Sequence, residues 1–170
     1  MSIDARVFYD LSYGVYIVGA ALSGKNNAMI VNSVMQVTAQ PEKIAICANK
    51  DSLTHEYILK SGFFTIQAIK EGADMVFIGN FGFRTGRNFD KFAKYQFKLT
   101  QNNLPVILEN TLDIFEIKTE QTVDLGTHTM FIGAVHSAEA LSVEGRPLTY
   151  NYYQTVMRGK TPRGATTFKG

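Results

Sequence analysis

Residues 32–55 read NSVMQVTAQPEKIAICANKDSLTH, in which two polar clusters flank one apolar run. The polar side chains are Asn32, Ser33, Gln36 and Thr38 in the first cluster and Lys50, Ser52 and Thr54 in the second. The run 43–48 follows Pro41 and predicts a buried strand, and a helix is predicted directly after the second cluster. Free N–H groups and the dipole at a helix N-terminus favour an anion. The stretch therefore predicts a strand that brings two polar clusters to one phosphate-bearing ligand.

The first cluster also has a purely structural interpretation. Residues 32, 36 and 38 share one face of a strand, so they could be the solvated side of a sheet while Ser33 faces the interior. Lys50 taken alone is compatible with an ordinary surface lysine. The sequence leaves both interpretations open.

The composition is that of a single folded domain. The chain has 170 residues, 45% of them hydrophobic, with 17 basic against 15 acidic residues, which gives no argument for a nucleic-acid or membrane partner. Its single cysteine, Cys47, excludes an intrachain disulfide and a CxxC metal site. We expect one domain over residues 1–157 and an extended C-terminal tail over 158–170. The N-terminal residues lack a signal-peptide pattern, so a cytoplasmic location is expected.

The pattern of apolar residues is mainly that of strands. Strands are predicted over 15–21, 28–38, 43–48, 63–69, 106–108, 111–122 and 127–136, and the tyrosine-rich run 148–156 is grouped with them. Helices are predicted over 52–60, 73–80 and 89–95. A change of phase near residue 115 indicates a bulge. This pattern predicts a mainly β fold, an antiparallel β-barrel with a few short helices, rather than a doubly wound parallel sheet.

Two familiar site motifs are incomplete. Residues 19–25 match G-x-x-x-x-G-K, but Asn26 stands where a P-loop has Ser or Thr, and a strand is predicted to follow instead of a helix. The sequence SGKNN is therefore predicted to be a hairpin turn. His128 and His136 share a strand face but would lie ~26 Å apart, so they do not bind one metal ion. No metal site and no catalytic side chain are predicted.

Several short motifs follow one another along the chain: LSYGVYIV (11–18), NSVMQVTAQP (32–41), NKDSLTHEYI (49–58), SGFFTI (61–66), GRNFDKF (86–92), HTMFIGAV (128–135) and PLTYNYY (147–153). In this order they resemble the flavin reductase-like family, whose fold is the FMN-binding split barrel. The nearest branch resembles the flavoredoxins and the flavin reductase domain of high-molecular-weight rubredoxins. The segment KTPRGATTF (160–168) resembles the point at which that rubredoxin domain begins, and no CxxC pair is present. An electron-accepting iron site is therefore expected on another protein.

The resemblance implies a homodimer with FMN at or near the subunit interface, FAD being the less favoured flavin. It assigns the flavin ring and ribityl chain to Asn32, Ser33, Val34, Met35 and Gln36. It assigns the phosphate to Ala48, Asn49, Lys50, Ser52 and Thr54, with Arg84 and Arg87 reaching toward the phosphate or a second ligand. His128 matches the family's strand histidine near the cofactor or the nicotinamide.

The function implied by the resemblance is that of an FMN-binding oxidoreductase. It would take electrons from NAD(P)H and pass them to a flavin, to ferric iron or to a protein acceptor. The alternative is an FMN-carrying electron-transfer protein that exchanges electrons with rubredoxin or a flavodiiron protein and has little NAD(P)H activity. A third interpretation is a barrel that binds no cofactor and serves as an interaction module. In both flavin interpretations the cofactor carries the chemistry and the side chains supply orientation.

Overall fold

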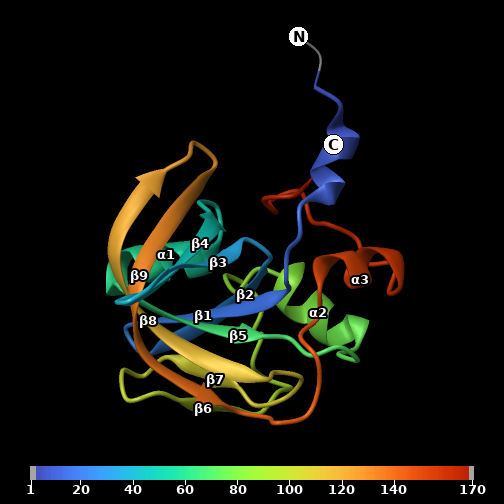
Figure 1. The fold of residues 1–170 in the computed structure, drawn as a ribbon. Helices are drawn as coiled ribbons and strands as arrows, with labels where there is room; N and C mark the ends of the chain where they lie inside the picture. Colours follow the sequence, from blue (N-terminus) through green and yellow to red (C-terminus); the bar gives the residue numbers. More distant parts are fainter. Residues whose placement is uncertain (1–2, 169–170) are drawn as a thin grey trace.

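The computed structural model describes residues 3–168, which form a curved antiparallel sheet with helices at its sides (Figure 1). The elements in chain order are η1 (Ala5–Asp10), β1 (Tyr16–Leu22), β2 (Lys25–Val31), β3 (Val34–Ala39), β4 (Glu42–Asn49), α1 (Leu53–Ser61), β5 (Phe63–Ala68), α2 (Met75–Gly82), β6 (Phe97–Leu99), β7 (Pro105–Ile107), β8 (Asp113–Asp124), β9 (His128–Ala140) and α3 (Tyr150–Thr155). Seven strands are hydrogen-bonded in the order β2-β1-β5-β8-β9-β4-β3, and β6 pairs with β7. The predicted mainly β, antiparallel fold is confirmed.

The two edge strands of the large sheet are consecutive in the sequence. β2 and β3 lie at opposite ends of the strand order, yet only Asn32 and Ser33 connect them. The prediction of one strand over 28–38 is therefore wrong. Its apolar alternation continues through the connection, but the chain crosses there from one edge of the sheet to the other. This crossing curls the sheet and puts Asn32 and Ser33 at the split of the barrel.

The segment SGKNN forms the β1–β2 hairpin, as predicted. Ser23 has a φ of 50° and Gly24 a φ of 74°. A two-residue type I′ turn requires left-handed backbone at both central positions, and these two residues lie between the paired Leu22 and Lys25. The match of residues 19–25 to a P-loop is thus a coincidence of sequence.

Helix α1 begins and ends where its sequence predicts. The Ser52 hydroxyl accepts a hydrogen bond from the His55 N–H at 3.1 Å and caps the N-terminus. Gly62 ends the helix with a φ of 75°, and its N–H donates to the Ile58 carbonyl at 2.9 Å. The predicted helix over 73–80 is displaced by two residues in α2, because Asp74 is its N-cap.

Two other predicted elements are wrong. Residues 89–95 form turns rather than a helix, because the buried ammonium of Lys91 donates to the carbonyls of Ala28 at 2.8 Å and Phe81 at 3.1 Å. Residues 148–156 contain α3 rather than a strand. Thr149 caps α3 by accepting a hydrogen bond from the Tyr152 N–H at 3.2 Å. At residues 89–95 a tertiary contact overrides the local helical preference, whereas at residues 148–156 a local N-cap favours a helix over the strand.

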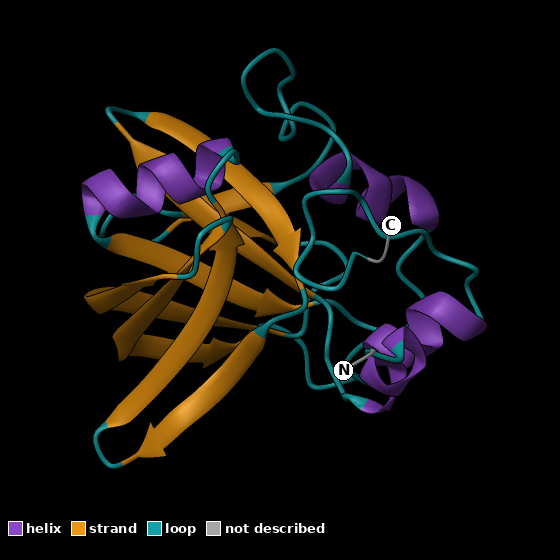
Figure 2. Cartoon of the chain, turned by 90° about the horizontal axis from the view of Figure 1, so that it is seen from above, coloured by secondary structure: helices purple, strands orange, loops and turns teal. Residues whose placement is uncertain are grey.

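The helices enclose two hydrophobic cores. Figure 2 shows α1 lying across the strands and the other helices grouped on the far side of the barrel. The first core fills the barrel beneath α1 and includes Val18, Ile46, Ile58, Phe64 and Phe131. The second core lies beneath α2 and α3 and includes Val15, Phe77, Phe81, Phe92 and Tyr153. The space between the barrel and α2 and α3 is where the candidate site lies.

Strand β8 is irregular, as its sequence indicates. Its pairing with β9 shifts register between Glu116 and Ile117 and again between Thr119 and Gln121, which confirms the bulge predicted near residue 115. Among the described residues, no helix is long and apolar enough to cross a membrane.

Candidate functional site

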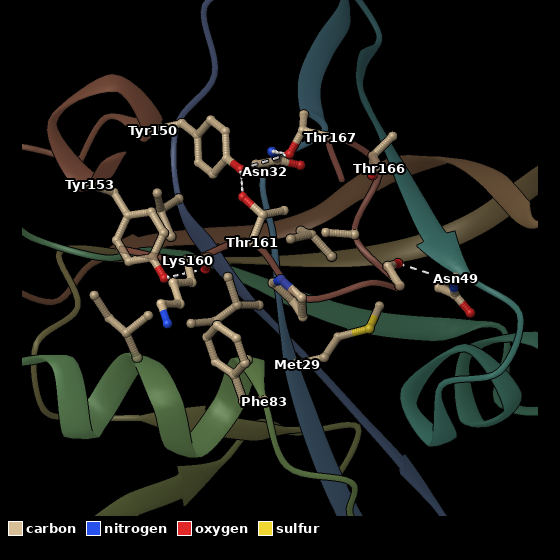
Figure 3. Close-up of a pocket in the computed structure, with 18 of the residues that line it drawn as sticks. Met29, Asn32, Asn49, Phe83, Tyr150, Tyr153, Lys160, Thr161, Thr166 and Thr167 are labelled. Atoms are coloured by element: carbon tan, nitrogen blue, oxygen red, sulfur yellow. Dashed lines mark hydrogen bonds between the residues drawn. The ribbon is translucent and has the colours of Figure 1, made fainter. Parts of the chain in front are cut away.

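A groove opens between β2, β4, α2 and α3 beside the split of the barrel. The residues that line it are Val15, Met29, Ile30, Val31, Asn32, Cys47, Asn49, Ile78, Gly82, Phe83, His128, Tyr150, Tyr153, Lys160, Thr161, Pro162, Gly164, Ala165, Thr166 and Thr167. Figure 3 shows Met29 and Phe83 on one side of the groove and Thr166 and Thr167 on the other. The floor is thus largely apolar, and the polar groups stand along the rim.

The polar rim next to the barrel comes from the two clusters of the 32–55 stretch. Asn32 follows the last residue of β2, and Asn49 is the last residue of β4. The Asn49 Oδ1 accepts from the Asp51 N–H at 2.8 Å, which fixes its side-chain amide. The Ser33 hydroxyl donates to the Cys47 carbonyl at 3.2 Å. Burial raises the pKa of the Cys47 thiol, which therefore stays protonated at neutral pH.

The opposite rim is built from the tyrosines of α3. The rings of Tyr150 and Tyr153 stack with centroids 6.0 Å apart. The Tyr153 hydroxyl donates to the Lys160 carbonyl at 2.8 Å, and the Tyr150 hydroxyl is hydrogen-bonded to Thr161. Burial is the main cause that raises the pKa of Tyr153, which keeps its hydroxyl a neutral donor. Both tyrosines thus hold the chain that follows α3 against the groove.

The second polar cluster surrounds the N-terminus of α1. The Lys50 ammonium forms a 2.6 Å ion pair with Asp124 in β8, and the Ser52 hydroxyl is engaged as the helix cap. Thr54 is fully buried, and its hydroxyl accepts from Asn27 Nδ2 at 2.9 Å. Lys50 and Ser52 therefore lie at the helix end, whereas the Thr54 hydroxyl faces the interior.

His55 marks the inner side of the same helix end. Its Nε2 is hydrogen-bonded to the Thr129 hydroxyl at 2.8 Å, and both residues are buried. Burial, and then the nearby Lys50 charge, lower the pKa of the imidazole. His55 is thus neutral at neutral pH and forms part of the packing between α1 and β9.

The two predicted arginines lie in the loop after α2. Arg87 Nη2 forms a 3.2 Å ion pair with Glu56 in the first turn of α1. Arg84 stacks on the Phe89 ring, with its guanidinium carbon 4.1 Å from the ring centroid. Gly86 lies between them, and a Cβ there would lie 2.0 Å from Asn27 Oδ1. This close approach ties the arginine loop to β2 and brings Arg87 beside α1.

The structure divides the predicted site residues into separate groups. Asn32, Asn49 and His128 line the groove, with Ser33 bonded at its edge. Val34, Met35 and Gln36 line a second cavity of about 290 Å³ instead, together with Tyr16 and Phe115. Ala48 is fully buried in β4. The first cluster therefore faces two cavities, because the chain changes direction between Ser33 and Val34.

Part of the groove is not predicted by any pattern in the sequence. Phe83, Tyr150 and the threonines 161, 166 and 167 line it, although residues 158–168 were expected to form an extended tail. The tyrosine-rich run and the threonines are visible in the sequence, but neither has a spacing that is specific for a binding site. They come together only because the chain after α3 folds back onto the barrel.

The donors around the groove suit a flavin. A flat heteroaromatic ring with carbonyl and N–H edges matches an apolar floor bordered by side-chain amides and hydroxyls. Lys50 beside the N-terminus of α1 suits a phosphate. The free volume of the groove is only about 80 Å³, whereas sites for ligands of this size usually enclose roughly 300–1,000 Å³. Within residues 3–168, no group of three His, Cys, Asp or Glu side chains is placed to hold a metal ion.

Comparison with known proteins finds a family profile and relatives that agree with one another. The profile of the flavin reductase like domain family matches residues 8–159. A high molecular weight rubredoxin of Moorella thermoacetica is 42% identical over 97% of this chain and 72% of its own length. A ferric-chelate reductase (NAD(P)H) of Archaeoglobus fulgidus is 38% identical over 97% of both chains.

Solved structures share the fold as well. The crystal structure of flavoredoxin from Methanosarcina acetivorans superposes with a TM-score of 0.73 at 25% identity, over 86% of this chain and 80% of that one. Nitrilotriacetate monooxygenase component B from Mycobacterium thermoresistibile superposes with a TM-score of 0.75 at 23% identity, over 85% of this chain and 79% of that one. With the matched profile, the strand order and the groove at the split, these relatives show that the chain belongs to the flavin reductase like domain family and is a split-barrel flavoprotein of the oxidoreductase class.

Proposed function

We propose that the chain is an FMN-dependent oxidoreductase that accepts electrons from NADH or NADPH and passes them to a flavin, to ferric iron or to a protein acceptor. The observation that carries the proposal is the meeting of Asn32, Asn49 and His128 around one apolar groove at the split of the barrel. The relatives add support, since one of them is a ferric-chelate reductase that uses NAD(P)H. FMN is favoured over FAD because Asn49 of the groove directly precedes Lys50 and the N-terminus of α1, which together suit one phosphate group.

The side chains of the site have binding and orienting roles. Asn32 and Asn49 would bond the polar edge of the flavin ring, and Lys50 with the α1 N-terminus would hold the phosphate. The apolar floor with Met29 and Phe83 excludes water from one ring face. When bound, the flavin supplies the chemistry, since it accepts a hydride from a reduced nicotinamide and releases electrons to the acceptor. No side chain has to act as an acid or a base in this scheme.

We also propose that the chain forms a homodimer. The edge strand β3 exposes Met35 (54%) and Val37 (37%) beside the second cavity, and an apolar edge of this kind is a ready surface for a second copy. Light scattering of the purified protein at micromolar concentration tests this, and a monomer mass would contradict it. A cytoplasmic location is part of the same proposal, since the chain has one cysteine and needs no oxidising compartment.

The decisive experiment is an anaerobic titration with NADH or NADPH, followed by the visible spectrum of the FMN-loaded protein. Rapid bleaching of the flavin absorption is the expected result. A protein that binds FMN but stays oxidised with both nucleotides would contradict the use of NAD(P)H.

The second candidate is an FMN-carrying electron-transfer protein with little NAD(P)H activity. It is favoured by the 42% identity to a high molecular weight rubredoxin and by the fold shared with a flavoredoxin. In that case the bound flavin would exchange electrons quickly with a rubredoxin or a flavodiiron protein and only slowly with NAD(P)H. Stopped-flow reduction by each donor in turn separates the two candidates.

A further inference from the structure

The segment that follows α3 lies across the groove and holds its polar rim. We call residues 158–168 the C-terminal strap. Its first part is fixed to α3, because the Gly159 N–H donates to the Tyr153 carbonyl at 2.9 Å and a Cβ at Gly159 would lie 2.1 Å from the Tyr153 ring. The Tyr153 hydroxyl also donates to the Lys160 carbonyl. The root of the strap is therefore tightly packed.

The far part of the strap ends on the residues that the sequence assigns to the cofactor. Asn32 Nδ2 donates to the Thr167 hydroxyl at 2.8 Å, and Asn49 Nδ2 donates to the Gly164 carbonyl at 3.0 Å. The hydroxyls of Ser33 and Thr166 are hydrogen-bonded at 3.0 Å. Three separate side chains of the site are thus occupied by one segment of the same chain.

The hydrogen bonds between the far part of the strap and the groove residues can break without unfolding the barrel. Residues 158–168 form no strand with the barrel, and two turns organise them internally, from the Ala165 N–H to Pro162 and from the Phe168 N–H to Ala165. Gly164 and Thr166 are exposed, so water can replace their partners when the segment lifts. The bond between Asn32 and Thr167 is half-buried, and the Thr167 hydroxyl also donates to the Tyr150 hydroxyl at 2.9 Å. Together these few side-chain hydrogen bonds still hold the segment weakly compared with a strand ladder.

The small free volume of the groove indicates what the strap does. With the strap in place the free volume is about 80 Å³, well below the roughly 300 Å³ at which sites for ligands of flavin size begin. We propose that the C-terminal strap is an intramolecular competitor of the flavin: its far part, Gly164–Thr167, must leave Asn32, Ser33 and Asn49 before the flavin binds, while its root stays on α3. This inference rests on the proposed FMN site. A strap closed nine-tenths of the time would weaken the apparent affinity about tenfold.

The first test compares two double variants of the full chain in their cofactor-free form. T166A/T167A removes both hydroxyls of the far part, whereas T166S/T167S loses the same methyl groups and keeps the hydroxyls. FMN association is followed by stopped-flow quenching of flavin fluorescence. We expect the alanine variant to bind FMN on the order of tenfold faster than wild type, which corresponds to about 1.4 kcal/mol, and the serine variant to match wild type. An alanine variant that binds FMN at the wild-type association rate, or more slowly, would overturn the proposal.

The second test reads the position of the strap directly. Trypsin cleaves after the exposed Arg163, and cleavage of a folded segment follows the population that is open. We expect FMN to accelerate cleavage after Arg163 in wild type, and the alanine variant to be cleaved quickly with or without FMN. Protection of Arg163 by FMN would show that the strap is a wall of the loaded site and would refute the competitor role. If no form of the protein binds FMN, the proposed function fails, and the strap inference fails with it.

Discussion

Asn27 Nδ2 donates a 2.9 Å hydrogen bond to the Thr54 hydroxyl, and this buried pair joins β2 to α1. The contact spans 27 positions of sequence and lies beneath Gly86, whose backbone packs against the Asn27 side chain. Strand, helix and arginine loop therefore meet at one amide group. A residue assigned to the phosphate by sequence is in this way part of the frame that supports the site.

Thr54→Val is expected to destabilise the fold without weakening FMN binding. It leaves the buried Asn27 amide without its acceptor, which costs about 1–3 kcal/mol in the free energy of unfolding. Thr54→Ser keeps the hydroxyl and serves as the control. Urea unfolding gives the stability and flavin fluorescence the affinity. A strong loss of FMN affinity in the folded valine variant would instead return Thr54 to the phosphate site.

Lys50→Met is expected to weaken binding of FMN but not of riboflavin, because only FMN carries the phosphate. The expected loss is about tenfold in Kd, the equivalent of about 1.4 kcal/mol. Asp124→Asn is the matched control, since it removes the other partner of the 2.6 Å ion pair and leaves the lysine in place. Both variants should keep nearly wild-type stability, because exposed ion pairs contribute little. An equal loss for FMN and riboflavin would exclude Lys50 from the phosphate site.

Because the pKa of Lys91 is lowered in the folded state, we expect the free energy of unfolding to increase as the pH rises above about 8. Burial lowers the pKa of its ammonium from 10.5 to about 8, so between these values the unfolded chain binds more protons than the folded one. Unfolding is then opposed more strongly as the pH rises through this window. The free energy of unfolding of wild type relative to Lys91→Met should increase by up to about 1.4 kcal/mol per pH unit between pH 8 and 10. A difference that is constant with pH would contradict the shifted pKa.

Gly133→Ala tests the close packing of β8 on β9. A Cβ at residue 133 would lie 2.4 Å from the Lys118 carbonyl oxygen, so the strands would have to move apart, at a cost of about 1–3 kcal/mol or more. Gly79→Ala is the comparison, because its Cβ meets no atom within 4 Å in the interior of α2, and alanine there should stabilise by up to about 1 kcal/mol. Similar melting temperatures for the two variants would contradict this contrast.

The features predicted correctly depend on neighbours in the sequence. The left-handed pair Ser23 and Gly24 sets the β1–β2 turn, and Ser52 and Gly62 set the ends of α1. Each of these residues acts on backbone groups a few residues away, so its effect can be predicted from a short stretch of sequence. The order of the motifs likewise identified the family, which the matched profile confirms.

Two of the features predicted wrongly depend on partners far along the chain. Residues 89–95 do not form a helix because Lys91 reaches the carbonyl of Ala28, 63 positions away. The single strand predicted over 28–38 is divided into β2 and β3, because the chain crosses between the two edges of the sheet at Asn32 and Ser33. The local pattern of apolar residues does not indicate this crossing.

The amino-acid sequence by itself thus determined the β1–β2 turn, the ends of α1, the mainly β class and the family of this protein. Only the tertiary structure decided which polar residues share a groove, that Thr54 faces the interior, and that the strap lies against the groove. The hydrogen bond between Asn32 and Thr167 joins residues 135 positions apart. Contacts of such separation arise from how the whole barrel closes, since loop-closure entropy has to be offset by burial elsewhere in the fold.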